Sequence, residues 1–146
     1  MTPVPALILG IVLALALVGV GRMLPPVSEI RIYAVGLAIA ALIYVLFAAT
    51  GGAPAQWLAF EAFGLLLYAS AVWVGLRGRP WLLSLGWAAH VVWDVLFHLS
   101  GGGAEYTPHW YPWTCLSFDL IMAVAVLASA RRATVGVTGD ARPRPG

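Results

Sequence analysis

Five apolar segments, each close to the length of a transmembrane helix, constrain the fold of this chain more than any other feature. An α-helix needs about 20 residues to cross ~30 Å of hydrocarbon. Glycine and proline mark the breaks between the segments, and none of the segments has the two-residue alternation of a barrel strand. We therefore predict an all-α, five-span transmembrane bundle, with spans at about residues 4–21, 32–49, 55–76, 81–99 and 111–130.

The composition indicates that the bilayer is the natural solvent. Of the 146 residues, 62% are hydrophobic and only 10% are charged, whereas a soluble domain has about 25% charged residues. We expect a single transmembrane domain over residues 1–132 and a disordered cytoplasmic tail over residues 133–146. The net charge of +2, without clusters of basic and aromatic residues, gives no sign of nucleic-acid binding.

The arginines predict the orientation of the bundle. With five spans, all of them fall in the first loop, the third loop or the tail, and these lie on one side of the membrane. By the positive-inside rule that side is cytoplasmic, which leaves the N-terminus outside. No basic residue precedes the first span, so we expect it to stay in the protein rather than act as a signal peptide. The expected location is the cell membrane, with several passes.

Acids and histidines lie inside the spans. The predicted topology puts Glu61, Asp94, His98 and Asp119 in the outer half of the membrane and His90 near its middle. An aspartate at the centre of a span costs about 2.5–3.5 kcal/mol on insertion scales. We therefore expect these groups, from three spans, to share one niche in which they pair with one another or hold a cation.

A metal site is one reading of this pattern. His90, Asp94 and His98 follow one another at four-residue spacing, which puts them on one stripe of a helix. His90 and His98 would be ~12 Å apart, too far to share an ion on a regular helix. We predict His90, Asp94, His98 and the loop residue His109 as ligands of a divalent metal. Imidazole with carboxylate suits zinc, iron or manganese. An interhelical hydrogen-bond network is the structural alternative.

Glu61 and Asp119 are the candidate catalytic residues. Either carboxylate could relay the proton of a metal-bound water. The glycines Gly101, Gly102 and Gly103 begin a loop that could fold over the mouth of the site as a lid, or could be a plain interfacial loop. For Cys115 we expect a packing role in the core and not a role as a nucleophile.

Separated motifs between residues 57 and 125 resemble a family of small bacterial integral membrane proteins known only as a domain of unknown function. The motifs are Glu61-Ala62-Phe63-Gly64, Pro80-Trp81, Gly86-Trp87, His90, Trp93-Asp94, His98, Tyr106-Thr107-Pro108, Trp110-Tyr111-Pro112, Cys115 and Phe118-Asp119. This resemblance implies a multi-span membrane protein and no particular reaction. The residue types are also similar to those of membrane hydrolases such as alkaline ceramidases and adiponectin receptors, which hold zinc with Ser, Asp and His but have seven spans.

Three functions remain open. The first is a membrane-embedded, metal-dependent enzyme, such as a hydrolase, that acts on a lipid-like or small amphiphilic substrate. The second is a metal-free acid/base isomerase or cyclase of an isoprenoid, in which Trp87 or Trp93 stabilises a cation. The third is a proton or ion carrier, or a partner subunit in the membrane. Because we expect no ionisable residue in the inner half of any span, the sequence argues against a continuous ion path.

Overall fold

The computed structural model describes residues 3–139, and the side chains of residues 3–132. Within these residues the chain folds into five long helices. No strand occurs within these residues, so the all-helical prediction is confirmed. The elements are α1 (Pro3–Arg22), α2 (Pro26–Thr50), α3 (Ala55–Leu76), α4 (Pro80–Trp93), the π-helix η1 (Asp94–Leu99), the 3-10 turn η2 (Gly102–Glu105) and α5 (Tyr111–Gly139).

Each of the five predicted spans corresponds to a helix that is long and apolar enough to cross a membrane. The candidate spans are Pro3–Arg22, Pro26–Thr50, Ala55–Leu76, Pro80–Leu99 and Tyr111–Arg132, the fourth being formed by α4 and η1 together. Large apolar side chains cover the outside of the bundle, for example Val124 at 70% and Leu66 at 68% exposure. Such a surface suits lipid rather than water.

Two helix ends differ from the predicted spans. α2 begins at Pro26 rather than near residue 32, because proline is well placed in the first turn, where its missing N–H would have no partner. The earlier start brings Glu29 into the span. α5 continues to Gly139, so it includes residues 133–139 of the expected disordered tail. Residues 140–146 lie outside the described residues.

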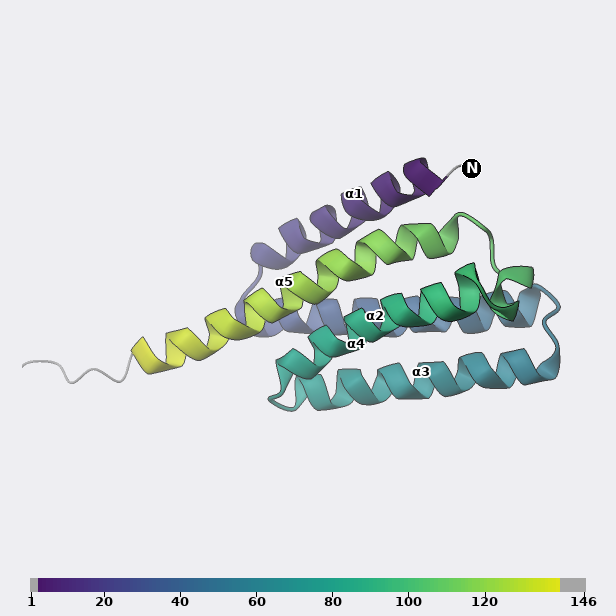
Figure 1. The fold of residues 1–146 in the computed structure, drawn as a ribbon. Helices are drawn as coiled ribbons and strands as arrows, with labels where there is room; N and C mark the ends of the chain where they lie inside the picture. Colours follow the sequence, from purple (N-terminus) through teal and green to yellow (C-terminus); the bar gives the residue numbers. More distant parts are fainter. Residues whose placement is uncertain (1–2, 140–146) are drawn as a thin grey trace, which may run out of the picture.

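The helices pack around a core shared by α2, α4 and α5. α1 lies along α5, while α3 covers α2 and α4 on the opposite side of the bundle (Figure 1). Large side chains such as Leu37, Trp87 and Met122 are fully buried where the helices meet. α1 approaches α5 closely at Gly10, where a Cβ atom would collide with the carbonyl of Thr114.

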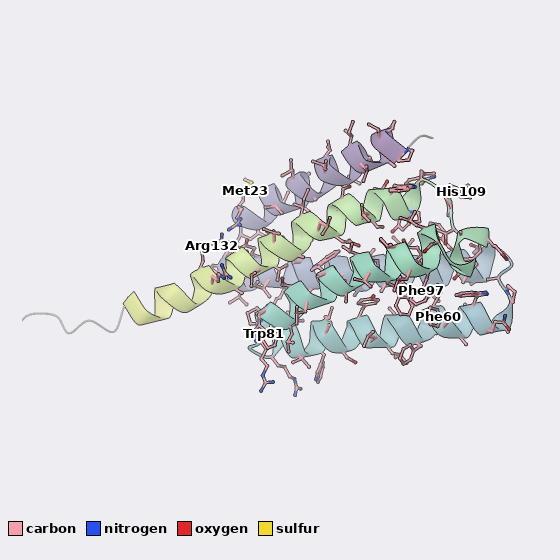
Figure 2. All side chains as sticks on the ribbon, viewed as in Figure 1. Met23, Phe60, Trp81, Phe97, His109 and Arg132 are labelled. Carbon is pink, nitrogen blue, oxygen red and sulfur yellow. The ribbon has the colours of Figure 1, made fainter. Side chains whose placement is uncertain are left out.

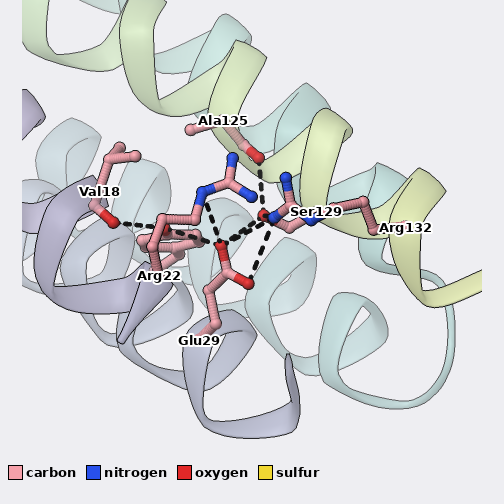
Figure 3. A network of polar contacts seen from close by, with 7 residues as sticks. Val18, Arg22, Glu29, Ala125, Ser129 and Arg132 are labelled. Carbon is pink, nitrogen blue, oxygen red and sulfur yellow. Dashed lines mark hydrogen bonds and ion pairs between the residues drawn. The ribbon is translucent and has the colours of Figure 1, made fainter. Parts of the chain in front are cut away.

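A network around Glu29 joins three helices at one end of the bundle (Figure 3). The Glu29 carboxylate accepts hydrogen bonds from Tyr33 at 3.1 Å, Ser129 at 2.7 Å and Arg132 at 3.1 Å. Arg22 completes it with an ion pair at 3.5 Å. The sequence-based expectation that no ionisable group lies in this half of a span was wrong, because it started α2 too late and missed Glu29.

The arginines and the loop after η1 lie at opposite ends of the bundle. Figure 2 shows Arg132 and Met23 toward the end where α1 joins α2, and His109 at the other end. The connection between α3 and α4, with Arg77 and Arg79, shares the Arg132 end (Figure 1). The arginines within the described residues therefore gather at one end, as the five-span topology requires.

Candidate functional site

The centre of the bundle holds a triangle of His90, Asp94 and Asp119, which are all 0% exposed. His90 Nδ1 lies 2.7 Å from Asp119 Oδ2, and 3.6 Å from Asp94 Oδ1. One ligand atom from each residue lies within 4.8 Å of the other two. α4 carries His90, η1 begins with Asp94, and α5 supplies Asp119, so the triangle forms only when the fourth and fifth spans pack together.

Several polar atoms of this triangle have no hydrogen-bond partner among the described residues. They are His90 Nε2, both carboxylate oxygens of Asp94, and Asp119 Oδ1. Buried polar groups in folded proteins are usually hydrogen-bonded, because an unpaired one costs about 1–3 kcal/mol. Unpaired oxygens on two adjacent buried carboxylates therefore favour a further group, such as a cation, at this point.

A second polar group surrounds Glu61 on α3. Tyr106 donates a hydrogen bond of 2.6 Å to Glu61 Oε1, and the indole of Trp93 donates one of 3.3 Å to Oε2. His98 Nε2 lies 3.4 Å from Oε1. The other ring nitrogen of His98 is 3.3 Å from the hydroxyl of Thr107. Glu61 is thus fixed from three sides, and only 2% of it is exposed.

Tyr44 of α2 lies between the two groups. Its ring stacks on His98 with the centroids 3.7 Å apart, and its centroid is 5.7 Å from that of His90. Its hydroxyl lies near Asp94 and Cys115, but it makes no hydrogen bond of standard geometry within the described residues. The five candidate residues inside the spans therefore form two adjacent groups bridged by an aromatic ring, rather than one cluster.

The helix geometry changes locally between His90 and His98. From Asp94 to Leu99 the chain is a π-helix, whose i→i+5 hydrogen bonds widen the turn and which is frequent at functional sites. His98, two turns beyond His90, pairs with Glu61 and not with Asp119. The sequence gives no separate signal for this turn beyond the polar residues themselves.

The loop after η1 closes over the Glu61 group. Tyr106 and Thr107 reach Glu61 and His98 from this loop. A Cβ atom on Gly103 would lie 2.5 Å from His98 Nδ1, and one on Gly102 would collide with the Trp57 ring. The glycines therefore permit close packing. Burial, together with the hydrogen bond to Glu61, raises the pKa of Tyr106 far above its usual range, so this hydroxyl remains a donor at neutral pH.

The remaining candidates lie apart from the triangle. His109 is exposed in the turn before α5, at the edge of the bundle (Figure 2). The group able to hold a metal contains Asp119 together with His90 and Asp94, while His98 pairs with Glu61. Asp119 was expected as a catalytic carboxylate, and its position also suits a ligand.

Comparison with known proteins adds a family and no activity. The family model of DUF6010, described as a family of unknown function, matches residues 5–132. The match covers all five candidate spans almost completely. No curated protein and no solved structure matches the chain.

Proposed function

The chain belongs to DUF6010, a family of unknown function, and we propose that it is a membrane-embedded, metal-dependent hydrolase of a lipid-like or small amphiphilic substrate. The observation that carries the proposal is the buried triangle of His90, Asp94 and Asp119. Neutral imidazole and carboxylate are ligands that suit zinc, iron or manganese. A catalytic zinc site typically has three protein ligands and an open position for water.

The dimensions of the triangle support one shared ion. Ligand atoms bonded to one tetrahedral zinc ion at about 2.0–2.2 Å lie about 3.3–3.6 Å apart. The three ligand atoms lie within 4.8 Å of one another, so the side chains would have to close by about 1 Å to share one ion. The unpaired oxygens of Asp94 and Asp119 would gain the partner that they lack.

The two polar groups divide the chemistry of hydrolysis between them. His90, Asp94 and Asp119 would hold a cation that lowers the pKa of a water molecule and so supplies a nucleophile for the carbonyl carbon of an ester or amide. The carbon–oxygen or carbon–nitrogen bond would break, and a proton would pass to the leaving alcohol or amine. Glu61 and His98, held by Tyr106 and Thr107, are the neighbouring groups suited to relay that proton.

Placement in the membrane is part of the proposal. The arginines gather at one end of the bundle, and the positive-inside rule makes this end cytoplasmic in the cell membrane, with the N-terminus outside. The Glu61 group then lies near the outer surface. Between the central triangle and the Glu29 network the core is apolar, with Leu37, Trp87 and Met122. This apolar layer argues against an ion path across the membrane.

Metal analysis of the purified protein tests the proposal. We expect about one divalent ion per chain after zinc is supplied and excess metal is removed, and loss of that ion in Asp94→Ala and Asp119→Asn. His109→Ala is the matched control, because its exposed side chain lies outside the triangle. Absence of stoichiometric metal from the intact protein would exclude the metal-dependent mechanism.

One observation favours a metal-free alternative. The His90–Asp119 hydrogen bond of 2.7 Å already forms an acid/base pair without an ion, as isomerisation or cyclisation of an isoprenoid would require. Chelators separate the two readings, because activity that survives complete metal removal would select the acid/base reaction.

A further inference from the structure

A groove on the side of the bundle reaches Asp119 from the lipid-facing surface. It has a volume of about 420 Å³ and lies between α1, α2 and α5. Ligand pockets typically span about 300–1,000 Å³. α1 packs mainly along α5 (Figure 1), and the groove occupies the space that it leaves beside α2. Leu13, Val35 and Ile39 at its edges are about half exposed, so it opens toward the bilayer.

The lining of the groove is polar at one end only. From α5 it receives Tyr111 and Thr114 near the end of the bundle with the η1–α5 loop, and Cys115 and Asp119 deeper, toward the centre of the bundle. Toward the arginine end the lining is apolar, with residues such as Leu17 and Ile32. A molecule that fits this lining has its polar part near Asp119 and its hydrocarbon tail toward the arginine end.

Asp119 connects the groove with the central triangle. It is 0% exposed, it lines the groove, and its Oδ1 atom has no hydrogen-bond partner within the described residues. Its other oxygen is held by His90 at 2.7 Å. Asp119 thus belongs both to the central triangle and to the lining of the groove, so the groove ends next to the triangle.

The length of the groove selects the kind of tail. On α2 the lining runs from Ile32 to Ile43, which corresponds to about 17 Å at 1.5 Å per residue. One leaflet contributes about half of the ~30 Å hydrocarbon core, or about 15 Å. This stretch is centred on the span Pro26–Thr50, so the groove has room for about half a membrane's thickness of one hydrocarbon chain, lying parallel to the helices around the middle of the bilayer.

We propose that this groove takes one hydrocarbon chain of a membrane amphiphile, which enters sideways from the bilayer and brings its polar end to Asp119. The inference deepens the proposed function, because it makes the substrate class a lipid or single-chain amphiphile of the membrane. It rests on the proposed function for the reaction, but not for binding of the chain.

Photolabelling tests the groove directly. The full chain is reconstituted into phosphatidylcholine vesicles with a fatty acid that carries a diazirine in the middle of its chain, and labelled residues are found by mass spectrometry. We expect labels on Leu17, Ile39 and Phe118 of the groove to exceed several-fold those on Leu66 and Leu67 of α3, which are exposed but lie outside this groove.

A matched pair of variants on α2 makes the test specific. Ile39→Trp should fill the groove and lower labelling of Phe118 several-fold. Leu46→Trp should leave it unchanged, because Leu46 is 50% exposed, like Ile39 at 51%, but does not line the groove. Circular dichroism and size-exclusion chromatography identify variants that fold, and Val35→Trp replaces Ile39→Trp if that variant does not.

The outcomes separate the groove from the metal centre. Labelling that is uniform over the lipid-exposed helices, or that Ile39→Trp leaves unchanged, would overturn the groove even if the protein binds metal. Groove-specific labelling of a protein that binds no metal would support the groove and remove only the hydrolase. We expect Ile39→Trp to keep the metal content of the intact protein.

Discussion

The Nδ1 atom of His90 lies 2.7 Å from the Oδ2 atom of Asp119, and this contact joins α4 to α5 at the centre of the bundle. In hydrocarbon, helices gain little from the hydrophobic effect on one another, so close packing and polar contacts between helices matter more. The same groups that would bind a cation therefore also hold the fourth and fifth spans together.

Removal of His90 should destabilise the bundle strongly. His90→Ala leaves Asp94 and Asp119 buried without the imidazole between them, and breaking a buried ion pair costs about 3–5 kcal/mol. Thermal unfolding in detergent, measured without metal, should show a large loss of stability. His109→Ala, at an exposed site, should unfold like the intact protein; equal stability of the two variants would mean that the triangle does not hold the helices.

Tyr106→Phe should cost about 1–3 kcal/mol, the penalty for an unsatisfied buried acceptor, because Glu61 loses the hydrogen bond of 2.6 Å. The raised pKa of Tyr106 adds a pH dependence. A phenol whose pKa rises on folding contributes fully below its unfolded value of about 10 and loses that contribution as the pH rises above it. The stability difference between Tyr106→Phe and the intact protein should therefore be constant near neutral pH and shrink in strong alkali.

Tyr68→Phe is the control for that experiment. Tyr68 is also buried at 2% exposure, and its hydroxyl makes no hydrogen bond with another described residue. Removal of this hydroxyl should change the free energy of unfolding much less. If Tyr68→Phe lost as much unfolding free energy as Tyr106→Phe, the hydrogen bond to Glu61 would not explain the effect of Tyr106→Phe.

Gly10→Ala should loosen α1 from α5. A methyl group there would collide with the carbonyl of Thr114 and the hydroxyl of Ser117, whose Oγ donates to the Leu7 carbonyl at 2.8 Å. Overpacking of this kind costs about 1–3 kcal/mol. Gly19→Ala on the same helix is the matched control, because nothing lies within 4 Å of its added methyl, and it should stabilise slightly or do nothing. Thermal unfolding of the pair measures the difference.

Glu29→Gln should weaken the end of the bundle where three helices meet. The amide loses the charge that attracts Arg22 and Arg132, and one of the two is half exposed, so the effect should be smaller than that of His90→Ala. Arg31→Gln, which removes an exposed charge from the same helix, is the control. Limited proteolysis at the junction of α1 and α2 should be faster in Glu29→Gln than in Arg31→Gln. Equal rates in the two variants would contradict the inference that the Glu29 network holds the three helices together.

The number of helices could be predicted from the sequence because runs of about 20 apolar residues have few other stable solutions. The helix ends were less readable. Pro26 reads as a breaker in a sequence, yet it occupies the first turn of α2, and this ambiguity hid Glu29 from the prediction.

The pairing of polar residues was less accessible than the helices. Spans that are apolar on every face carry no stripe that tells which side turns inward, so the contact between His90 and Asp119 depends on the rotation of α5. The rise of ~12 Å expected between His90 and His98 already indicated that the two histidines would not share an ion. The π-helix at Asp94 and the pairing of His98 with Glu61 could not be read from the helical spacing.

Asp94→Asn distinguishes a metal centre from a packing network. Both oxygens of Asp94 lack hydrogen-bond partners within the described residues, and Asp119 lies close by. Without metal, the uncharged amide removes the repulsion from Asp119 but also weakens the contact of 3.6 Å with His90, so Asp94→Asn should lose much less stability than His90→Ala. A network that needed the carboxylate for packing would instead lose as much stability as in His90→Ala.

Added zinc should make the intact protein more stable than Asp94→Asn. A ligand that binds only the folded state stabilises it by about 2.7 kcal/mol at a concentration of about 100 times Kd. The unfolding temperature of the intact protein and of His109→Ala should therefore rise with zinc, while that of Asp94→Asn should not, since a ligand of the triangle is lost. The same rise in Asp94→Asn would show that zinc binds elsewhere. No rise in the intact protein would leave the His90–Asp119 pair as a metal-free acid/base group.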